Sequence, residues 1–373
     1  MPARPMNRRQ KRRIAVVIVA TQVVLALLTG TAVYAFYSRI DGNIRSGNAM
    51  HHVVTKPRVT GPTGPLDILV MGTDTRDCAG CGIDDEQGSG GSDTTILVHI
   101  SADRKTVYGI SIPRDALVKP VACTQDHLYV NPDGVPTSYV EWNEAFAVGG
   151  PSCTAAQVER NFGVYVDDYV VVNFGGFKDM VDAVGGVDVC IPEELYDPAY
   201  QPHDFKPGEH VHLGGAVALQ YFRMRHGGPA LDGSDTGRIK RQQYFISRLI
   251  DKVFSGDTLS DPVKLYKFAN AFTKSIETNP QLASTSALIG LARQLAHVDL
   301  SHIRFITVPS ADYPTDSVYY DRVRILPAAK TLMKRVDEDE PLGRFGKGAQ
   351  HAGRSEPTSA ARRQELLRYG LCS

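Results

Sequence analysis

The run Ile14–Tyr37 constrains this chain more than any other segment, because it is apolar and contains no charged residue. About 20 apolar residues cross a bilayer as a helix, so the run is long enough to span a membrane with some tilt. The residues Arg8–Arg13 before it are almost all basic, and such flanks stay in the cytoplasm. We therefore expect a cytoplasmic basic tail over 1–13, a single-pass anchor in the cell membrane over 14–37, and an extracytoplasmic domain after it.

A cleaved signal peptide is the alternative for this run, since Val33, Tyr34 and Ala35 loosely resemble a cleavage site. The apolar part of a signal peptide is usually shorter, at roughly 7–15 residues, which favours an uncleaved anchor. The residues before the anchor are too few for a DNA-binding domain. With 41 basic and 41 acidic residues, the chain also lacks the basic excess of a general nucleic-acid binder. We expect no nucleic-acid partner.

The six cysteines fit an extracytoplasmic domain, because an even number on the oxidising side of a membrane favours disulfides. Cys78 and Cys81 form a C-x-x-C pair, which could also be half of a zinc site or a redox pair. No second C-x-x-C completes a four-thiolate site, so a structural bridge is the favoured interpretation. The expected disulfides are Cys78–Cys81, Cys123–Cys153 and Cys190–Cys372, although other pairings stay open.

A polar, turn-rich linker, Ser38–Pro65, follows the anchor, and short apolar strands then alternate with helices. The expected strands cover 66–72, 94–100, 105–112, 169–174, 187–191 and 303–308. The expected helices cover 140–150, 154–163, 176–186, 242–254, 262–275, 282–295 and 328–336. The first of these helices would end at Gly149, and the second would run from a Thr154/Gln157 capping box to Gly163.

This alternation predicts an α/β fold, an α/β/α sandwich, over residues 66–337. The polar residues 338–373 are expected to form a mostly mobile tail with a tether at Cys372. The catalytic or binding residues should therefore lie within 66–337.

The stretch YFRMRHGGPALDGSDTGRIKRQQ gathers cations in a chain without net charge. Alternation in YFRMRH would place Arg223 and Arg225 on one face of an extended segment. Arg238, Arg241 and Gln242 follow at i, i+3 and i+4, which is one face of a helix. Guanidinium groups bind phosphate bidentately and a helix N-terminus favours anions, so the spacing predicts a phosphate site. A solvated charged face is the alternative.

Two aspartates and one arginine stand at expected strand ends, where α/β sheets place ligands. Asp74 follows one strand, Asp93 precedes the next, and Arg114 stands just beyond the third. Two carboxylates at neighbouring strand ends suit Mg²⁺, which takes few protein carboxylates and completes its shell with phosphate oxygens. For each aspartate by itself, a turn or capping role is the alternative.

Seven segments resemble the LytR–CpsA–Psr family in order and spacing: GTDTR, GGSDTTILVHIS, SIPRD, NEAFAVGG, VDAVGGVDVCIP, ALQYFRMRH and SDTGRIKRQQ. The resemblance covers roughly residues 34–336, and the last two segments are the most specific. It implies an α/β/α sandwich around a mixed central sheet and the activity of an extracytoplasmic phosphotransferase. Such enzymes move a glycopolymer from a polyprenyl-pyrophosphate carrier onto peptidoglycan and leave a phosphodiester link. The implied partners are the carrier-linked glycopolymer, peptidoglycan and the membrane.

Carried over by position, the resemblance implies Mg²⁺ as cofactor, held by Asp74 and Asp93. It implies a pyrophosphate surrounded by Arg114, Arg223, Arg225, Asp235, Arg238, Arg241 and Gln242. The implied catalytic residues are Asp93, Arg114, Arg223 and Arg225, and Asp93 is the candidate for activating the acceptor hydroxyl. The metal and the guanidinium groups would neutralise charge on the transferred phosphoryl group. His226, beside the arginines, is a further candidate for contact with phosphate.

The chain departs from the family pattern at two places. The glycine run GSGGSD stands where many members have an arginine shortly before the position of Asp93, and Glu141 stands where many have a lysine. Both departures remove positive charge near the phosphates. His210 and His212 share an expected strand, and we interpret them as structural rather than metal-binding.

Two other functions are compatible with the sequence. A lipid pyrophosphatase would use the same site with water as the acceptor. A non-catalytic wall-binding or regulatory membrane protein would need neither the paired acids nor the arginines.

Overall fold

The computed structural model of the chain describes residues 7–54, 64–73, 91–123, 139–196, 204–225, 233–254, 256–353 and 360–372. It divides into two units, Met1–Asn43 and Ile44–Ser373, and each is described by itself. All of the candidate site residues discussed below belong to the second unit.

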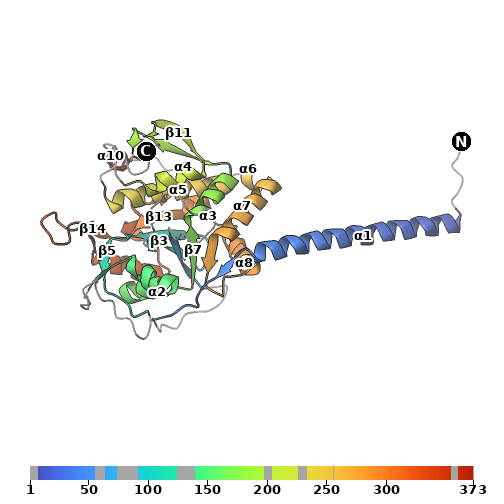
Figure 1. Cartoon of the computed structure of the whole chain (residues 1–373), viewed down its shortest axis with the longest axis horizontal. Helices are drawn as coiled ribbons and strands as arrows, with labels where there is room; N and C mark the ends of the chain where they lie inside the picture. Colours follow the sequence, from blue (N-terminus) through green and yellow to red (C-terminus); the bar gives the residue numbers. More distant parts are fainter. Residues whose placement is uncertain are drawn as a thin grey trace. The chain divides into compact units, whose positions relative to one another are not determined.

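In its described residues, the first unit is one long helix, α1 (Arg8–Asp41; Figure 1). The part Arg8–Thr31 has a mean hydropathy of 2.3, and none of it is buried within the protein. A helix of 34 residues is about 51 Å long, whereas the hydrocarbon core of a bilayer is about 30 Å thick. By length and composition, α1 is therefore compatible with a single-pass membrane anchor.

The second unit is built around a mixed sheet. The order of its described strands is β1 (Arg45–Ser46), β12 (Ile276–Thr278), β7 (Asp168–Asn173), β2 (Leu66–Thr73), β3 (Ser92–Ile100), β4 (Val107–Ile112), β13 (Ile303–Thr307) and β16 (Gln350–His351). Strand β2 is parallel to β7 but antiparallel to β3, and β13 is parallel to β4. The mixed sheet implied by the family resemblance is thus present.

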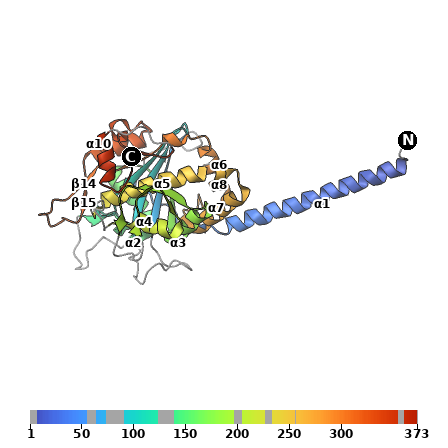
Figure 2. The same ribbon diagram turned by 90° about the horizontal axis from the view of Figure 1, so that it is seen from above.

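Helices cover both faces of this sheet (Figures 1 and 2). One face is covered by α3 (Phe174–Ala183), α4 (Gly215–Arg223), α5 (Asp235–Phe254) and α7 (Pro262–Ser275). The other is covered by α2 (Glu144–Phe162) and α9 (Ala328–Asp337). The remaining α-helices among the described residues of this unit are α6 (Gly256–Leu259), α8 (Thr285–Leu295) and α10 (Ala360–Leu367). This is the predicted α/β/α sandwich.

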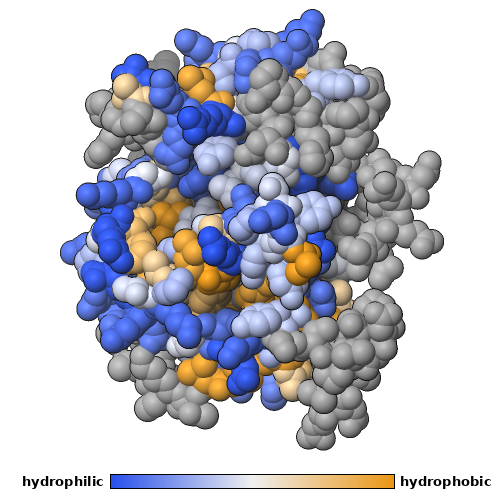
Figure 3. Space-filling model, turned by 90° about the vertical axis from the view of Figure 1, so that its left-hand side faces the viewer, coloured by the Kyte–Doolittle hydropathy of each residue, from blue (hydrophilic) through white to orange (hydrophobic). Residues whose placement is uncertain are grey.

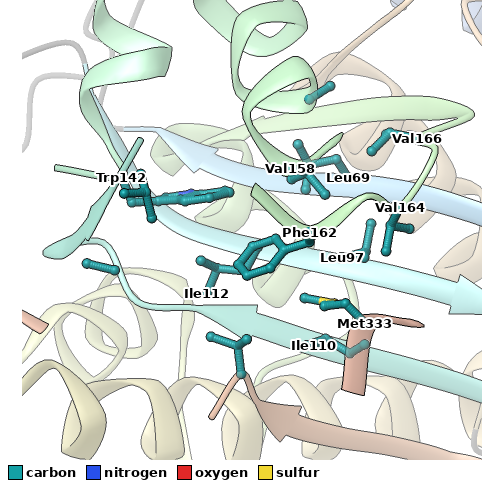
Figure 4. Packing of buried hydrophobic residues seen from close by; sticks show 14 of the residues in the cluster. Leu69, Leu97, Ile110, Ile112, Trp142, Val158, Phe162, Val164, Val166 and Met333 are labelled. Carbon is teal, nitrogen blue, oxygen red and sulfur yellow. The ribbon is translucent and has the colours of Figure 1, made fainter. Parts of the chain in front are cut away.

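Alternation along the strands explains why the sheet has two apolar faces. Leu69, Met71 and Leu97 join the core beneath α2 and α9, whereas Ile68 and Ile100 join a cluster on the opposite side. Figure 4 shows the first of these cores, in which aromatic rings from α2 and the preceding segment lie against the strands. Full burial of one large apolar side chain contributes roughly 1.5–3 kcal/mol, so this contiguous packing accounts for much of the stability of the sandwich.

A smaller sheet extends from the end of β4 and positions the site. Its described strands are β14 (Ser310–Asp312), β15 (Val323–Ile325), β5 (Ala116–Val118) and β6 (Val140–Glu141), in that order. Two further pairs are β8 (Val187–Ile191) with β11 (Gly208–Leu213), and β9 (Leu195–Tyr196) with β10 (Asp204–Phe205). Because β5 follows Arg114 and Asp115 directly, the small sheet fixes the backbone on one side of those residues.

The structure differs from the predicted helices around α2. Val140 and Glu141 form strand β6, and the helix begins only at Glu144. It then bends at Gly150 (φ 68°) rather than ending at Gly149, so Thr154 lies inside the helix and its hydroxyl donates to the Gly150 carbonyl. A backbone with positive φ suits glycine, which explains why this position absorbs the bend. Gly163 ends α2 in the left-handed conformation, as predicted.

The linker also differs from the expected stalk. Strand β1 lies within Ser38–Pro65 and pairs with β12. Farther along, the N–H groups of Val53 and Val54 donate to the buried carboxylate of Glu159, at 2.7 and 3.2 Å. The linker residues around Val53 and Val54 are therefore packed on the domain.

The described C-terminal residues form ordered elements, in contrast to the mostly mobile tail expected from composition. Strand β16 pairs with β13 at the edge of the sheet, and Leu366 and Leu371 are buried. The disulfide Cys190–Cys372 ties this segment to β8. Cys123–Cys153 is also formed, so two expected disulfides are confirmed, while Cys78 and Cys81 lie outside the described residues.

Candidate functional site

Three arginines and three aspartates meet where β3, β4, α4 and α5 come together. Asp93 is the second residue of β3, Arg114 and Asp115 lie between β4 and β5, and Arg225 follows α4. Asp235 and Arg238 lie in the first turn of α5, and together the cluster comprises Asp93, Arg114, Asp115, Arg225, Asp235 and Arg238. We call these six residues the arginine–aspartate cluster. Segments more than a hundred residues apart in the sequence thus contribute to one site.

Asp235 connects the cations of this cluster. Its carboxylate accepts from the backbone N–H of Arg114 at 2.9 Å, from Arg225 Nη2 at 3.4 Å, and from Arg238 Nη2. The side chain is only 2% exposed and lies in the first turn of α5, where a negative charge is favourable. Asp235 therefore fixes the relative positions of three segments that carry arginines.

Arg114 lies between two carboxylates. It pairs with Asp93 through Nη1 and with Asp115 through Nε, the latter at 3.1 Å. Burial alone would lower the pKa of Arg114, but these two carboxylates outweigh it and raise the pKa above its usual range. Burial likewise opposes ionisation of Asp115, yet Arg225 and Arg114 hold its pKa below the ordinary value. Both groups are therefore charged at neutral pH.

Arg225 lies among both positive and negative neighbours. Its Nη2 lies 3.3 Å from Asp115 Oδ2 and 3.4 Å from Asp235 Oδ1. Burial and the nearby Arg238 nevertheless lower the pKa of Arg225, and its attraction to Asp115 only partly offsets them. A guanidinium in such surroundings is stabilised by an added anion, and its side chain remains 24% exposed to meet one.

Arg238 is the most enclosed arginine of the cluster. Its side chain is 5% exposed, and Nη2 donates to Asp235 and to the backbone carbonyl of Asp93 at 3.4 Å. Its buried Nε–H has no hydrogen-bond acceptor among the residues that the structure describes. Buried donors of this kind are rare in folded proteins, so the cluster retains capacity for a further acceptor such as a phosphate oxygen.

Arg241 and Gln242 face the protein interior. Arg241 is 1% exposed and donates to the backbone carbonyls of Met224 and Tyr369. Gln242 donates to the carbonyl of Phe222 at 3.2 Å. Both side chains thus fasten the backbone that leads to Arg225, which is a positioning role different from the direct phosphate contact expected of them.

Arg223 does not share an extended segment with Arg225, so that interpretation of YFRMRH is wrong. Tyr221–Arg223 is the end of helix α4, and Met224 after it (φ −53°, ψ 130°) is no longer helical. The apolar side of this turn packs into the core, which explains the helical outcome. The Arg223 guanidinium lies 5.1 Å from the centre of the Phe174 ring, a cation–π contact.

Asp74 and His226 lie outside the described residues. The strand before Asp74 ends at Thr73, which is paired with Ser92 after a register shift, so this strand end lies beside the backbone of Asp93. Within the described ranges, no group of three His, Cys, Asp or Glu side chains forms a metal site. One or two carboxylates with substrate phosphates suffice for Mg²⁺, and the Asp93 side chain is 21% exposed, so its chemistry fits that ion.

Glu141 forms an ion pair with Arg322, with Oε1 and Nη2 2.6 Å apart. The negative charge that replaces a lysine of the family pattern is thus neutralised by a residue of the loop before β15. His212 pairs with Asp188 at 2.8 Å on the exposed edge of β11, in keeping with the structural interpretation of that histidine.

Two residues were not recognised from the sequence. Asp115 is part of SIPRD, and its place directly after Arg114 was the available signal. Gln243 is fully buried and donates to Ser111 Oγ at 2.9 Å and to Thr307 Oγ1 at 3.1 Å, which fixes α5 to β4 and β13. It belongs to the pair QQ, of which the spacing predicts a role in the site only for Gln242.

Comparison with known proteins reveals related sequences. The polyisoprenyl-teichoic acid–peptidoglycan teichoic acid transferase TagV of Bacillus subtilis is 30% identical over 284 residues, which span 73% of this chain and 65% of TagV. The cell wall biosynthesis protein LcpA of Corynebacterium glutamicum is 26% identical, with 92% of this chain and 69% of LcpA aligned. The chain thus spans only about two thirds of the length of these relatives.

Solved structures share the fold. The crystal structure of B. subtilis TagV superposes with a TM-score of 0.55 at 28% identity and covers 74% of this chain and 97% of that one. A LytR-Csp2A-Psr enzyme from Actinomyces oris gives a TM-score of 0.56 at 20% identity, with 78% of this chain and 96% of that chain covered. The model of the LytR_cpsA_psr family matches residues 33–335. Since this match covers most of the chain, the protein belongs to the LytR_cpsA_psr family.

Proposed function

We propose that this protein is a membrane-anchored, Mg²⁺-dependent phosphotransferase that moves a glycopolymer from a polyprenyl-pyrophosphate carrier to peptidoglycan and leaves a phosphodiester link. The observation that carries the proposal is the arginine–aspartate cluster, in which three guanidinium groups converge and the buried Nε–H of Arg238 has no acceptor in the described part of the chain. The name of the relative TagV describes transfer of teichoic acid to peptidoglycan, which supports the same class of substrate.

The chain's own residues would act chiefly by holding charge in place. Arg225, Arg238 and Arg114 are arranged to bind the pyrophosphate oxygens, and their carboxylate partners keep them oriented before the substrate arrives. Arg223 can approach from the end of α4, where Phe174 supports its guanidinium. Such preorganised donors stabilise charge that develops on the transferred phosphoryl group.

Asp93, together with Asp74, would hold the metal. When bound, Mg²⁺ would neutralise phosphate charge and act as a Lewis acid. The attacking hydroxyl of peptidoglycan would form the new bond to the sugar-linked phosphorus, while the bond to polyprenyl phosphate breaks and that group leaves. Asp93 is also the candidate for accepting the hydroxyl proton, but its use as a metal ligand makes this the less favoured of its two roles.

The decisive experiment uses the full chain in detergent micelles with a polyprenyl-pyrophosphate-linked saccharide, soluble peptidoglycan strands, and either Mg²⁺ or a chelator. We expect Mg²⁺-dependent formation of saccharide-bearing peptidoglycan. Release of the saccharide phosphate into solution, with no linkage to peptidoglycan, would instead identify a lipid pyrophosphatase. No reaction under either condition would favour a wall-binding protein.

The proposed location is the outer face of the cell membrane, with the second unit outside the cytoplasm. It is supported by the apolar helix α1 and by the disulfides Cys123–Cys153 and Cys190–Cys372. Protease added to spheroplasts should digest the second unit, and complete protection of that unit would refute this orientation.

A further inference from the structure

A pocket lies at the end of β5 that is farther from the arginine–aspartate cluster. Its volume is about 570 Å³, and its walls are formed by β5, the C-terminal end of α2 and the segment from β15 to the first turn of α9. The side of the molecule that carries β5 and β14 in Figure 1 shows apolar side chains in recesses between hydrophilic ones (Figure 3). None of the functions considered so far uses this pocket.

Three cations line this pocket, and none of its lining residues is acidic. They are Lys119, Arg160 and Lys330, and all three are exposed. Within the described part of the chain, none of them forms an ion pair, whereas Lys334, one turn beyond Lys330, lies 3.7 Å from Glu338. Three uncompensated positive charges around one pocket create a potential that attracts anions.

The position of Lys330 is unfavourable unless an anion binds nearby. Helix α9 has no acidic residue in its first turn and no side-chain cap, and Lys330 lies in that turn. The N-terminal end of a helix carries partial positive charge, so a cation there is destabilising. Arg160 lies in the last turn of α2, where a cation is favourable, so the helix dipole accounts for Arg160 but not for Lys330.

The pocket is held in shape by side chains that bind its backbone. The backbone N–H of Lys119 donates to Asn161 Oδ1 at 3.1 Å, and Asn161 Nδ2 donates back to the Lys119 carbonyl at 3.0 Å. The pairing of Val118 with Val140 brings Tyr139 opposite Lys119, and Tyr139 is 56% exposed. An exposed aromatic ring with a hydroxyl group suits the apolar face and the hydroxyl groups of a sugar.

Two parallel strands connect the pocket with the arginine–aspartate cluster. Strand β5 begins directly after Asp115, and the backbone N–H of Val323, at the start of β15, donates to the Asp115 carbonyl at 3.0 Å. The two strands then run side by side toward the pocket. The four residue-to-residue steps from Asp115 to Lys119 span about 13 Å in an extended chain. One substrate can therefore reach both places.

We propose that this pocket binds an anionic saccharide, a sugar unit that carries a phosphate or a carboxylate group, next to the site of transfer. Lys119, Arg160 and Lys330 neutralise the anionic group, and Tyr139 packs against the sugar ring. The identity of the incoming ligand rests on the proposed function: a phosphate would belong to the donor glycopolymer, and a carboxylate to the peptidoglycan acceptor.

Binding is tested first, because it does not depend on catalysis. The full chain in detergent micelles is titrated by calorimetry with glucose 1-phosphate, N-acetylmuramic acid and the neutral N-acetylglucosamine. The double substitution Lys119→Gln/Lys330→Gln is expected to weaken binding of an anionic sugar about tenfold. Lys334→Gln, which removes the same charge one turn away on α9, should leave binding unchanged.

Tyr139→Ala separates this pocket from the arginine–aspartate cluster. It should weaken binding of the anionic sugars but not of inorganic phosphate, which the arginines can bind by themselves. If the double variant binds both anionic sugars as tightly as the parent protein, or the neutral sugar binds equally well, the proposal is wrong. Thermal unfolding of each variant shows whether it is folded.

Kinetics then distinguishes the two sources of the ligand. In an active enzyme, a higher KM of the double variant for the polymer identifies the donor phosphate, and a higher KM for peptidoglycan identifies the acceptor carboxylate. Unchanged KM values for both would exclude a role of the pocket in transfer. If the anionic sugars bind in a salt-dependent manner but no transfer occurs, the proposed function is wrong and the proposal that the pocket binds an anionic saccharide is retained.

Discussion

The surroundings of Arg225 and Arg223 differ, although only one residue separates them. Arg225 reaches Asp115 and Asp235 through a single nitrogen, Nη2, within a cluster of other cations. Arg223 instead lies over the Phe174 ring at the end of α4. A phosphate that enters the cluster would relieve repulsion at Arg225, so we expect the two arginines to contribute unequally.

Replacement of Arg225 by Lys should lower the rate of glycopolymer transfer by roughly 10²-fold, because lysine keeps the charge but loses the guanidinium fork. Arg223→Lys should have a smaller effect, since a lysine on α4 can still approach an anion. Lys240→Ala serves as the control on α5. Initial rates at saturating donor decide, and equal rates for all four proteins would mean that the cluster is a solvated charged surface.

Asp93→Asn should reduce transfer by at least about 10²-fold and weaken Mg²⁺ binding, because a neutral amide is a poor ligand for a hard cation. Calorimetric titration of the full chain with MgCl₂, in the presence of inorganic pyrophosphate, measures the affinity without turnover. Asp103→Asn, an exposed aspartate near Lys105, is the matched control. Undiminished Mg²⁺ affinity in the Asp93 variant would remove this residue from the metal site.

The sequence predicts the residue types of the site better than their individual roles. Spacing in TGRIKRQQ predicts a helical face correctly, and α5 begins even earlier, at Asp235. The spacing does not reveal which members of that face are buried. The burial of Arg241 depends on Met224 and Tyr369, whose backbone carbonyls accept its hydrogen bonds. Partners so distant in the sequence leave no local pattern.

Among the elements, the junction between β2, β3 and the residues after α9 contains a buried histidine. His99 is 1% exposed; its Nδ1 lies 2.8 Å from Asp67, its partner in the β2–β3 register, and its Nε2 lies 3.0 Å from Asp339. The Tyr108 ring stacks on it with centroids 6.0 Å apart. Burial by itself lowers the pKa of His99, but Asp67 and Asp339 outweigh it and raise the pKa above 6.5.

This junction should make stability dependent on pH. The folded state binds the His99 proton more tightly than the unfolded chain, so the stabilisation is complete below the unfolded pKa of about 6.5 and is lost as pH rises through the raised folded value. Asp339→Asn should lower the free energy of unfolding by roughly 1–2 kcal/mol at pH 6 and by less at pH 9.

Chemical denaturation of the full chain at several pH values measures this effect. Glu338→Gln, beside Asp339 but paired with Lys334, is the control and should show no such dependence. A loss of stability in the Asp339 variant that is the same at every pH would contradict the role given to His99.

Element types are well predicted where hydrophobic periodicity is strong, as in α7, which matches its expected bounds Pro262–Ser275. They are poorly predicted where tertiary contacts decide. In YFRMRH a two-residue alternation is overridden because Tyr221 and Phe222 are buried as parts of a helix. The sequence does not predict strand β16, because this strand is short and forms through pairing with β13.

At the scale of the whole molecule, the disulfide Cys190–Cys372 holds the C-terminal segment in place. In that segment the carbonyl of Tyr369 accepts a hydrogen bond from Arg241. Replacing both cysteines by Ala should lower the free energy of unfolding by roughly 2–5 kcal/mol and also slow transfer, because the support of Arg241 is weakened. The pair Cys123→Ala/Cys153→Ala should destabilise the protein without a comparable loss of rate at temperatures where both variants are folded. Thermal unfolding and initial rates measure both effects.

The disulfide Cys190–Cys372 can form only after the whole domain has been synthesised. The bridge joins residues 182 positions apart, and contacts at such separation form late in folding. In the proposed orientation, strand β8 would leave the ribosome and cross the membrane long before Cys372. The disulfide that holds the segment bonded to Arg241 would then close only when the end of the domain has emerged into an oxidising environment. Maturation of the proposed site would thereby depend on completed export, and a chain stalled in translocation would hold its arginines without the support that aligns them.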